Sequence, residues 1–159
     1  MAESKILGKI KTSQLPLLDS TLELAIFDEI LSLMFQRNET ELTDNQLNVL
    51  LTFIYDSEVL NGGHLQYFQN QGSENIRRIL DFLPTIGAEC QKEILTKVFE
   101  KSQELPEVAA ETFEQFHERV MKGEFFNFDM AYYKCSPEIV GELLPQYVNQ
   151  NLSAFVEIE

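Results

Sequence analysis

The sequence predicts an all-α fold, a single compact domain of six to eight helices. Apolar residues recur at intervals of three and four through most of the chain, which is the spacing of one helix face. Capping residues, glycine breaks and prolines mark the ends of these segments, and strand-like alternation is weak. The length of 159 residues is typical of one domain.

Three parts of the chain differ in composition. Residues 1–14 carry three lysines without helical periodicity, so we expect a loose basic leader. The helical domain is predicted over 15–151. Residues 152–159 have some strand character but are short, and we expect a C-terminal tail.

The first two helices have clear start signals. One is predicted over 21–36, with Ser20 as its N-cap. The next is predicted over 44–60, where Thr43 and Gln46 form a capping box. Asn61-Gly62-Gly63 then interrupts the pattern, because glycine readily adopts conformations that end a helix.

Shorter helices follow this break. Helices are predicted over 64–71 and 74–83, with Gly72 as the C-cap between them. The remaining helices are predicted over 88–104, 106–122 and 137–149, with a short helix or turn in the aromatic-rich segment 124–136. Pro106 suits a first helical turn, whereas Pro145 lies inside the last helix and predicts a kink.

The two cysteines, Cys90 and Cys135, lie far apart and have no neighbouring metal-ligand pattern. We expect buried free thiols in a reducing, cytoplasmic environment, with a disulfide or a functional thiol as the alternatives.

Charge is the unusual feature of this chain. There are 26 acidic residues against 12 basic ones, a net charge of −14. The acids concentrate in residues 12–76 and 106–159. A field of this sign repels nucleic acid and anionic membranes and attracts basic proteins. Solubility alone is the other interpretation.

Two groups of carboxylates are candidates for binding a basic partner. The first shares one face of the helix predicted over 106–122, opposite its apolar stripe of Ala109, Phe113, Phe116 and Val120. The second lies in a stretch where Arg37 is the only base. The candidates are Glu107, Glu111, Glu114 and Glu118, with Asp28, Glu29, Glu39, Glu41 and Asp44.

The sequence contains no convincing catalytic, cofactor-binding or metal-binding constellation. Phosphate-binding glycine loops and nucleophile elbows are absent. Glu114 and His117 form a single ExxH, whereas helical di-metal sites use two copies and further glutamates. A pocket near Asp56, His64 and Tyr67 is the remaining enzyme hypothesis.

The segment after the predicted break carries a specific motif. Its residues are Asn61, Gly62, Gly63, Gln66, Tyr67, Phe68, Asn70 and Gly87. Together with Gly72-Ser73 and Ile86-Gly87-Ala88, this pattern resembles the bacterial DNA-mimic-protein family over about residues 55–100. The resemblance implies an all-helical, dimeric, acidic protein that occupies a repressor-type DNA-binding protein. We interpret the motif residues themselves as structural, with Gln66 and Asn70 bonding backbone at the turns.

The leading hypothesis is a non-enzymatic protein-binding module that presents carboxylates to a basic, DNA-binding partner. The alternatives are an interaction or immunity-type protein that uses an apolar surface around Phe125–Tyr133, or a purely structural domain.

Overall fold

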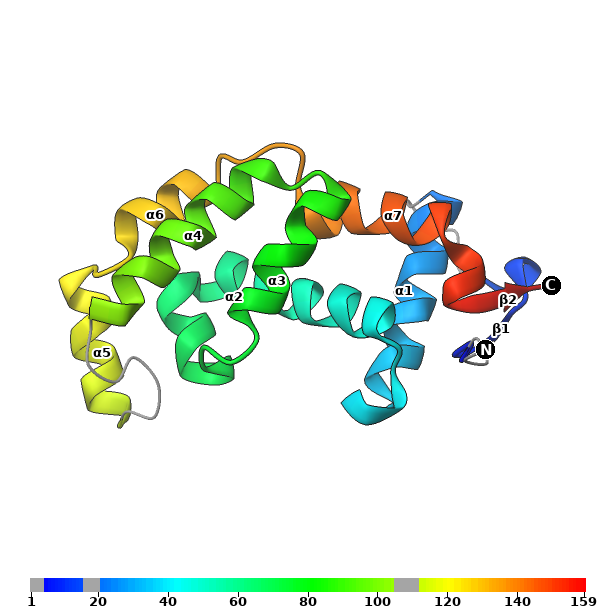
Figure 1. The fold of residues 1–159 in the computed structure, drawn as a ribbon, viewed down its shortest axis with the longest axis horizontal. Helices are drawn as coiled ribbons and strands as arrows, with labels where there is room; N and C mark the ends of the chain where they lie inside the picture. The colour runs from blue at the N-terminus through cyan, green and yellow to red at the C-terminus, as the bar shows by residue number, and fades with distance from the viewer. Residues whose placement is uncertain (1–4, 16–20, 105–111) are drawn as a thin grey trace.

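The computed structural model describes residues 5–15, 21–104 and 112–159. Seven α-helices and one two-stranded sheet in this part of the chain confirm the all-α class (Figure 1). The ribbon is elongated, with both strands at one end and α5 at the other. The helices are α1 (Leu22–Phe35), α2 (Asp44–Gln71), α3 (Ile76–Phe82), α4 (Glu89–Glu104), α5 (Phe113–Lys122), α6 (Phe126–Tyr132) and α7 (Leu144–Gln150). The other elements are β1 (Gly8–Ile10), β2 (Val156–Ile158), the 3-10 turns η1 (Thr12–Gln14), η2 (Glu39–Glu41), η3 (Leu83–Ile86) and η5 (Leu152–Ala154), and the π-turn η4 (Ile139–Leu143).

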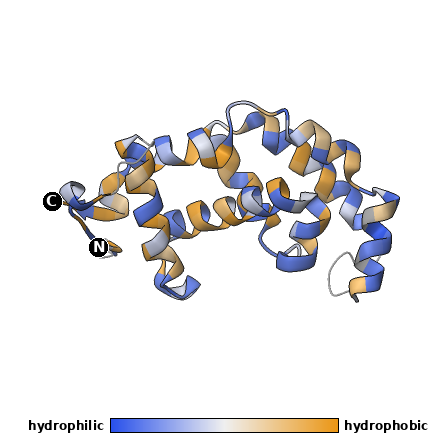
Figure 2. Ribbon diagram, turned by 180° about the vertical axis from the view of Figure 1, so that it is seen from behind, coloured by the Kyte–Doolittle hydropathy of each residue, from blue (hydrophilic) through white to orange (hydrophobic). Residues whose placement is uncertain are grey.

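Helix α2 is the centre of the packing. It contacts α1, α3, α5, α6 and η4. Figure 2 shows hydrophobic residues along much of the ribbon in the middle of the molecule, whereas α5 is largely hydrophilic. The largest fully buried side chains include Tyr55, Tyr67 and Phe68 of α2 itself. Each buried aromatic ring removes about 150–250 Å² from water, so this cluster dominates the hydrophobic stabilisation.

The capping box at the start of α2 is confirmed, and it has a second role. The Thr43 hydroxyl accepts a hydrogen bond from the Gln46 backbone N–H, and the Gln46 amide oxygen accepts one from the Thr43 N–H. The other half of the buried Gln46 amide donates to the carbonyls of Lys5 (2.7 Å) and Ala154 (2.9 Å). One side chain therefore starts α2 and fixes a segment from each end of the chain.

The expectation of a loose leader over 1–14 is wrong for its described part, residues 5–14. Strand β1 pairs in parallel with β2, so that Gly8 lies opposite Val156 and Ile10 opposite Ile158. Leu7 and Ile10 are buried in the core. Pairing the strands satisfies backbone groups that neither short segment can satisfy alone. The tail 152–159 likewise contains β2.

Two predictions about helix starts and kinks differ from the structure. Thr21 caps α1 by accepting a hydrogen bond from the Leu24 N–H, whereas the predicted cap Ser20 lies outside the described residues. Pro145 does not kink a continuous helix, because the π-turn η4 precedes it and Pro145 occupies the first turn of α7. Pro106 also lies outside the described residues.

The prediction of free thiols is wrong. Cys90, at the start of α4, forms a disulfide with Cys135, which follows α6, and the Cα atoms lie 5.8 Å apart. The two cysteines are 45 positions apart in the sequence, and the fold places them next to each other. The bond ties α4 to α6, which also pack directly against each other.

We expect reduction of this disulfide to lower the free energy of unfolding by about 2–4 kcal/mol, because it releases a long closed loop in the unfolded chain. Urea denaturation with and without dithiothreitol measures the change. Cys90→Ser combined with Cys135→Ala serves as a control that no reductant should affect. An unchanged midpoint for the reduced protein would contradict this role.

Candidate functional site

The predicted partner-binding carboxylates are exposed wherever the structure describes them. They comprise Asp28 and Glu29 on α1, Glu39 and Glu41 in η2, Asp44 at the start of α2, and Glu114 and Glu118 on α5. Glu107 and Glu111 lie outside the described residues. Asp44 is 3.4 Å from the Arg78 guanidinium, and none of the other six forms an ion pair within the described part of the chain.

The structure separates these residues into two groups. Helix α5 lies at the end of the molecule away from the strands, whereas α1 and η2 lie nearer the termini (Figure 1). Both α5 and η2 extend toward the lower edge of that view, with α2 between them. The described carboxylates therefore lie in two separate regions, one on α5 and the other on α1, η2 and the start of α2, and do not form one uninterrupted row.

The apolar stripe predicted for α5 does not hold at its first described position. Phe113 is 82% exposed, and its ring stacks on His117 with centroids 6.5 Å apart. Ala109 and the side chains of Phe116 and Val120 lie outside the described part. Helix α5 also begins later than predicted, at Phe113. Thr112 and Gln115 exchange the hydrogen bonds of a capping box at this start.

The predicted break is a sharp kink within α2. Gly62 and Gly63 have non-helical dihedrals, and Gly63 adopts φ 80° and ψ 179°, a conformation essentially restricted to glycine. A Cβ on Gly63 would lie 2.4 Å from Oδ2 of Asp129, so α6 also packs against the bare backbone here. The kink turns the second half of α2 back toward the first.

His64 follows the kink and is completely buried. Its Nδ1 lies 2.6 Å from Oδ1 of Asp129, which also accepts the His64 backbone N–H at 2.9 Å. Its Nε2 lies 2.8 Å from the Tyr55 hydroxyl. In the neutral ring this pattern assigns the proton to Nδ1, so Tyr55 donates to Nε2. The chain Tyr55–His64–Asp129 thereby joins both halves of α2 to α6.

Asp56 forms a second buried site beside the first. Only 2% of the residue is exposed, and its carboxylate accepts hydrogen bonds from the Tyr132 hydroxyl (2.5 Å) and the Val140 N–H (3.2 Å). The Tyr132 ring also contacts those of Tyr55 and His64. Burial raises the pKa of Tyr55 and of Tyr132 well above the ordinary value of 10.0, which keeps both hydroxyls protonated as donors.

Burial raises the pKa of Asp56 above its ordinary value of 3.8, against the opposing effect of its bonds from Tyr132 and Val140. The folded protein therefore binds this proton more tightly than the unfolded chain does. Its contribution to stability is fully present below the unfolded pKa and is lost as pH rises through the folded pKa. We expect the free energy of unfolding of the wild type, minus that of Asp56→Asn, to fall as pH rises from the ordinary pKa of 3.8 through the higher pKa of the folded protein.

Denaturant titrations of both proteins across this range measure that difference. The packing cost of the asparagine is the same at each pH, so it cancels from the slope. A difference that rises with pH would contradict the assignment.

The groups of the enzyme hypothesis face the core. Asp56, His64 and Tyr67 are buried, and none of them lines a described pocket. The hydrogen bonds of Asp56 and His64 join α2 to α6 and η4, as a structural role requires. In the described part of the chain, no three His, Cys, Asp or Glu side chains converge where a metal ion would bind. No described helix is both long and apolar enough to cross a membrane.

The family comparison agrees with the motif around the kink. The profile of the family described as DMP19-like protein matches residues 40–151, which is 112 of the 159 residues. The chain belongs to the DMP19-like family. This is a family of DNA-mimic proteins and not an enzyme class. Searches of curated proteins and of solved structures give no match.

The DMP19-like region contains the whole motif but only part of the candidate surface. Asp28, Glu29 and Glu39 precede the matched residues, whereas Glu41, Asp44 and the α5 glutamates lie within them. Several motif residues occupy positions that support the fold. Tyr67 and Phe68 are buried in the core, and Gly87 ends η3 with φ 81°.

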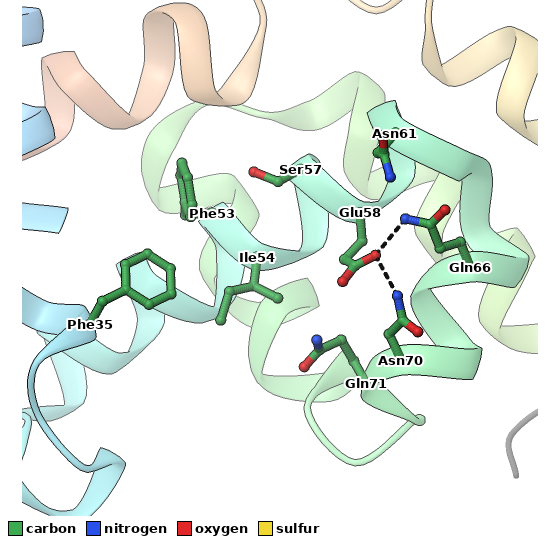
Figure 3. Close-up of a pocket in the computed structure, with 9 residues that line it drawn as sticks. All are labelled: Phe35, Phe53, Ile54, Ser57, Glu58, Asn61, Gln66, Asn70 and Gln71. Carbon is green, nitrogen blue, oxygen red and sulfur yellow. Dashed lines mark hydrogen bonds between the residues drawn. The ribbon is translucent and has the colours of Figure 1, made fainter. Parts of the chain in front are cut away.

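Gln66 and Asn70 have a different role from the backbone caps predicted for them. Both side-chain amides donate to Oε2 of Glu58, at 2.7 Å and 3.0 Å respectively. Figure 3 shows the three side chains on one side of a groove, between the two halves of α2. The kink creates this arrangement in the DMP19-like region, because it places residues after Gly63 beside residues before Asn61.

The groove has a volume of about 630 Å³. Its other side is apolar, formed by Phe35 at the end of α1 and by Phe53 and Ile54 of α2. Neither this groove nor Glu58 was among the sites predicted from the sequence. The available signal was the pair Gln66 and Asn70, which are four residues apart on one helix face.

Proposed function

We propose that this DMP19-like chain binds a basic, DNA-binding protein through its exposed carboxylates and occupies the surface that DNA would contact. The observation that carries the proposal is the exposure of all seven described candidate acids, six of them without an ion pair in the described region. Unpaired like charges destabilise a folded chain through mutual repulsion, so their retention favours a role in binding.

The geometry on α5 supports recognition of basic side chains. Glu114 and Glu118 are one turn apart, and carboxylates at this spacing lie about 5–6 Å from each other. Lysine and arginine side chains that contact successive phosphates of DNA can meet such a row. The exposed acids of α1 and η2 provide a second contact region beyond α2.

Capture from a lysate of the source cells, with stepped salt elution, tests the proposal. We expect a basic DNA-binding protein that elutes at moderate salt, because exposed charge pairs are screened as ionic strength rises. Elution of a neutral partner that resists salt would contradict it.

A second function has a specific observation in its favour. On α6 and at its end, Phe126, Met130 and Tyr133 are 60%, 41% and 45% exposed, at the spacing of one helix face. This apolar face supports either an interaction with an apolar partner or the homodimer that the family resemblance implies. Phe126→Ser would weaken such an association, measured by sedimentation, and moderate salt would not.

We place the chain in the cytoplasm, together with the DNA-binding partner. The Cys90–Cys135 disulfide removes the cysteine argument for a reducing compartment, so this location rests on the class of partner alone.

A further inference from the structure

The groove beside Glu58 contains a charge that the protein does not neutralise. Oε2 of Glu58 accepts hydrogen bonds from two neutral amides, those of Gln66 and Asn70. No cationic side chain lies within ion-pair distance of Glu58 in the described residues. Oε1 has no hydrogen-bond partner there, and Figure 3 shows it on the side facing Ile54.

The two amides hold the carboxylate in one position. A free glutamate side chain loses rotamer entropy when it binds a ligand, and a side chain already fixed by two hydrogen bonds loses less. Glu58 is also only partly exposed, so its charge is screened less by salt than the charges on α5 are. These properties favour a specific contact with one cation.

The opposite side of the groove selects the kind of cation. Phe35 is 56% exposed although it is aromatic, and its ring meets that of Phe53 at 5.9 Å between centroids. A planar guanidinium stacks on aromatic rings and is more weakly hydrated than an ammonium group, whereas lysine is a strongly hydrated point charge. Phe53 and Ile54 add an apolar surface of the kind on which the stem of an arginine packs.

We propose that this groove binds an arginine side chain, together with a neighbouring apolar residue, from the basic partner. The guanidinium donates to Oε1 of Glu58, and the apolar residue packs against Phe35 and Ile54. The inference rests on the proposed function for the class of partner, and it adds a specific contact to the carboxylate surface.

The test uses the full chain and a synthetic probe. The probe is an acetylated helical peptide with leucine and arginine on one face, compared with the same peptide carrying citrulline, which has the arginine shape without its charge. The side-chain amide resonances of Gln66 and Asn70 report on the groove directly, because both groups bond Glu58. We expect the arginine peptide to shift them and the citrulline peptide to bind at least about tenfold more weakly.

Two variants and a matched control complete the experiment. Glu58→Gln is expected to weaken peptide binding about tenfold, as loss of one charge-assisted hydrogen bond. Phe35→Ser removes an exposed part of the apolar wall and should also weaken it. Glu23→Gln makes the same change in net charge at an exposed position on α1 and should have less than about a twofold effect.

The outcomes separate this inference from the proposed function. Equal effects of Glu58→Gln and Glu23→Gln, or equal binding of the arginine and citrulline peptides, would overturn the arginine site and leave the α5 carboxylates untouched. Loss of peptide binding in Glu58→Gln alone would support the site even if the lysate yields no DNA-binding protein.

Discussion

Replacing Gly63 with alanine is expected to lower the free energy of unfolding by about 2.5–6 kcal/mol. The backbone at Gly63 lies in a region that other residues occupy only at a cost of about 1–3 kcal/mol. In addition, the new Cβ would lie 2.4 Å from Asp129 Oδ2 and displace the carboxylate that bonds both the ring and the backbone of His64. Loss of a hydrogen bond to a charged group costs about another 1.5–3 kcal/mol.

Gly72 provides a matched control for this prediction. It ends α2 with φ 70° and ψ −161°, so alanine meets similar backbone strain, but a Cβ there contacts nothing within 4 Å. Urea denaturation of Gly63→Ala and Gly72→Ala should therefore differ by about 2 kcal/mol, the part due to Asp129 and His64. Equal losses in the two variants would show that the contact with α6 adds nothing.

Reversing Glu114 and Glu118 together to lysine is expected to weaken partner binding about a hundredfold. Each change replaces an attraction to a basic surface with a repulsion, and about 1.4 kcal/mol per position is a tenfold effect. Both side chains are exposed, so the free energy of unfolding should change by less than about 0.5 kcal/mol. Titration calorimetry with the captured partner measures the first quantity and urea denaturation the second.

Glu100 and Glu104 on α4 form the control pair. They are also exposed and also four residues apart, and their reversal to lysine shifts the net charge from −14 to −10 as well. A general field effect weakens binding equally in both double variants. Only a specific contact on α5 makes Glu114→Lys/Glu118→Lys the weaker binder.

Local signals in the sequence predicted much of the helical structure. Thr43 and Gln46 start α2 as the capping box required, and the glycine pair ends its first half. These features depend on residues within four positions of each other, so the spacing of residues along the sequence is enough to predict them.

Features that depend on distant residues could not be predicted in this way. The β1–β2 pair joins residues near both ends of the chain, and the disulfide joins residues 45 positions apart. Gln46 was identified as a cap, but its bonds to Lys5 and Ala154 follow only from the packing of both termini on α2. Composition and spacing give no sign of such contacts.

The candidate site likewise combines features that the sequence predicts with features that depend on the fold. Charge counting identified carboxylates that are exposed where described, because an acidic side chain without a partner remains in water. It did not place them relative to one another, and it missed Glu58. The position of Glu58 beside Gln66 and Asn70 depends on the direction in which α2 turns at Gly63.

Competition with DNA tests whether this chain occupies the DNA-contacting surface of its partner. A fluorescent duplex bound to the captured DNA-binding protein is titrated with this chain at two salt concentrations, and its anisotropy is followed. We expect the wild type to displace the duplex and lower the anisotropy at both salt concentrations, and Glu114→Lys/Glu118→Lys to do so only at about hundredfold higher concentration. Simultaneous binding of duplex and chain, with no loss of anisotropy, would contradict DNA mimicry.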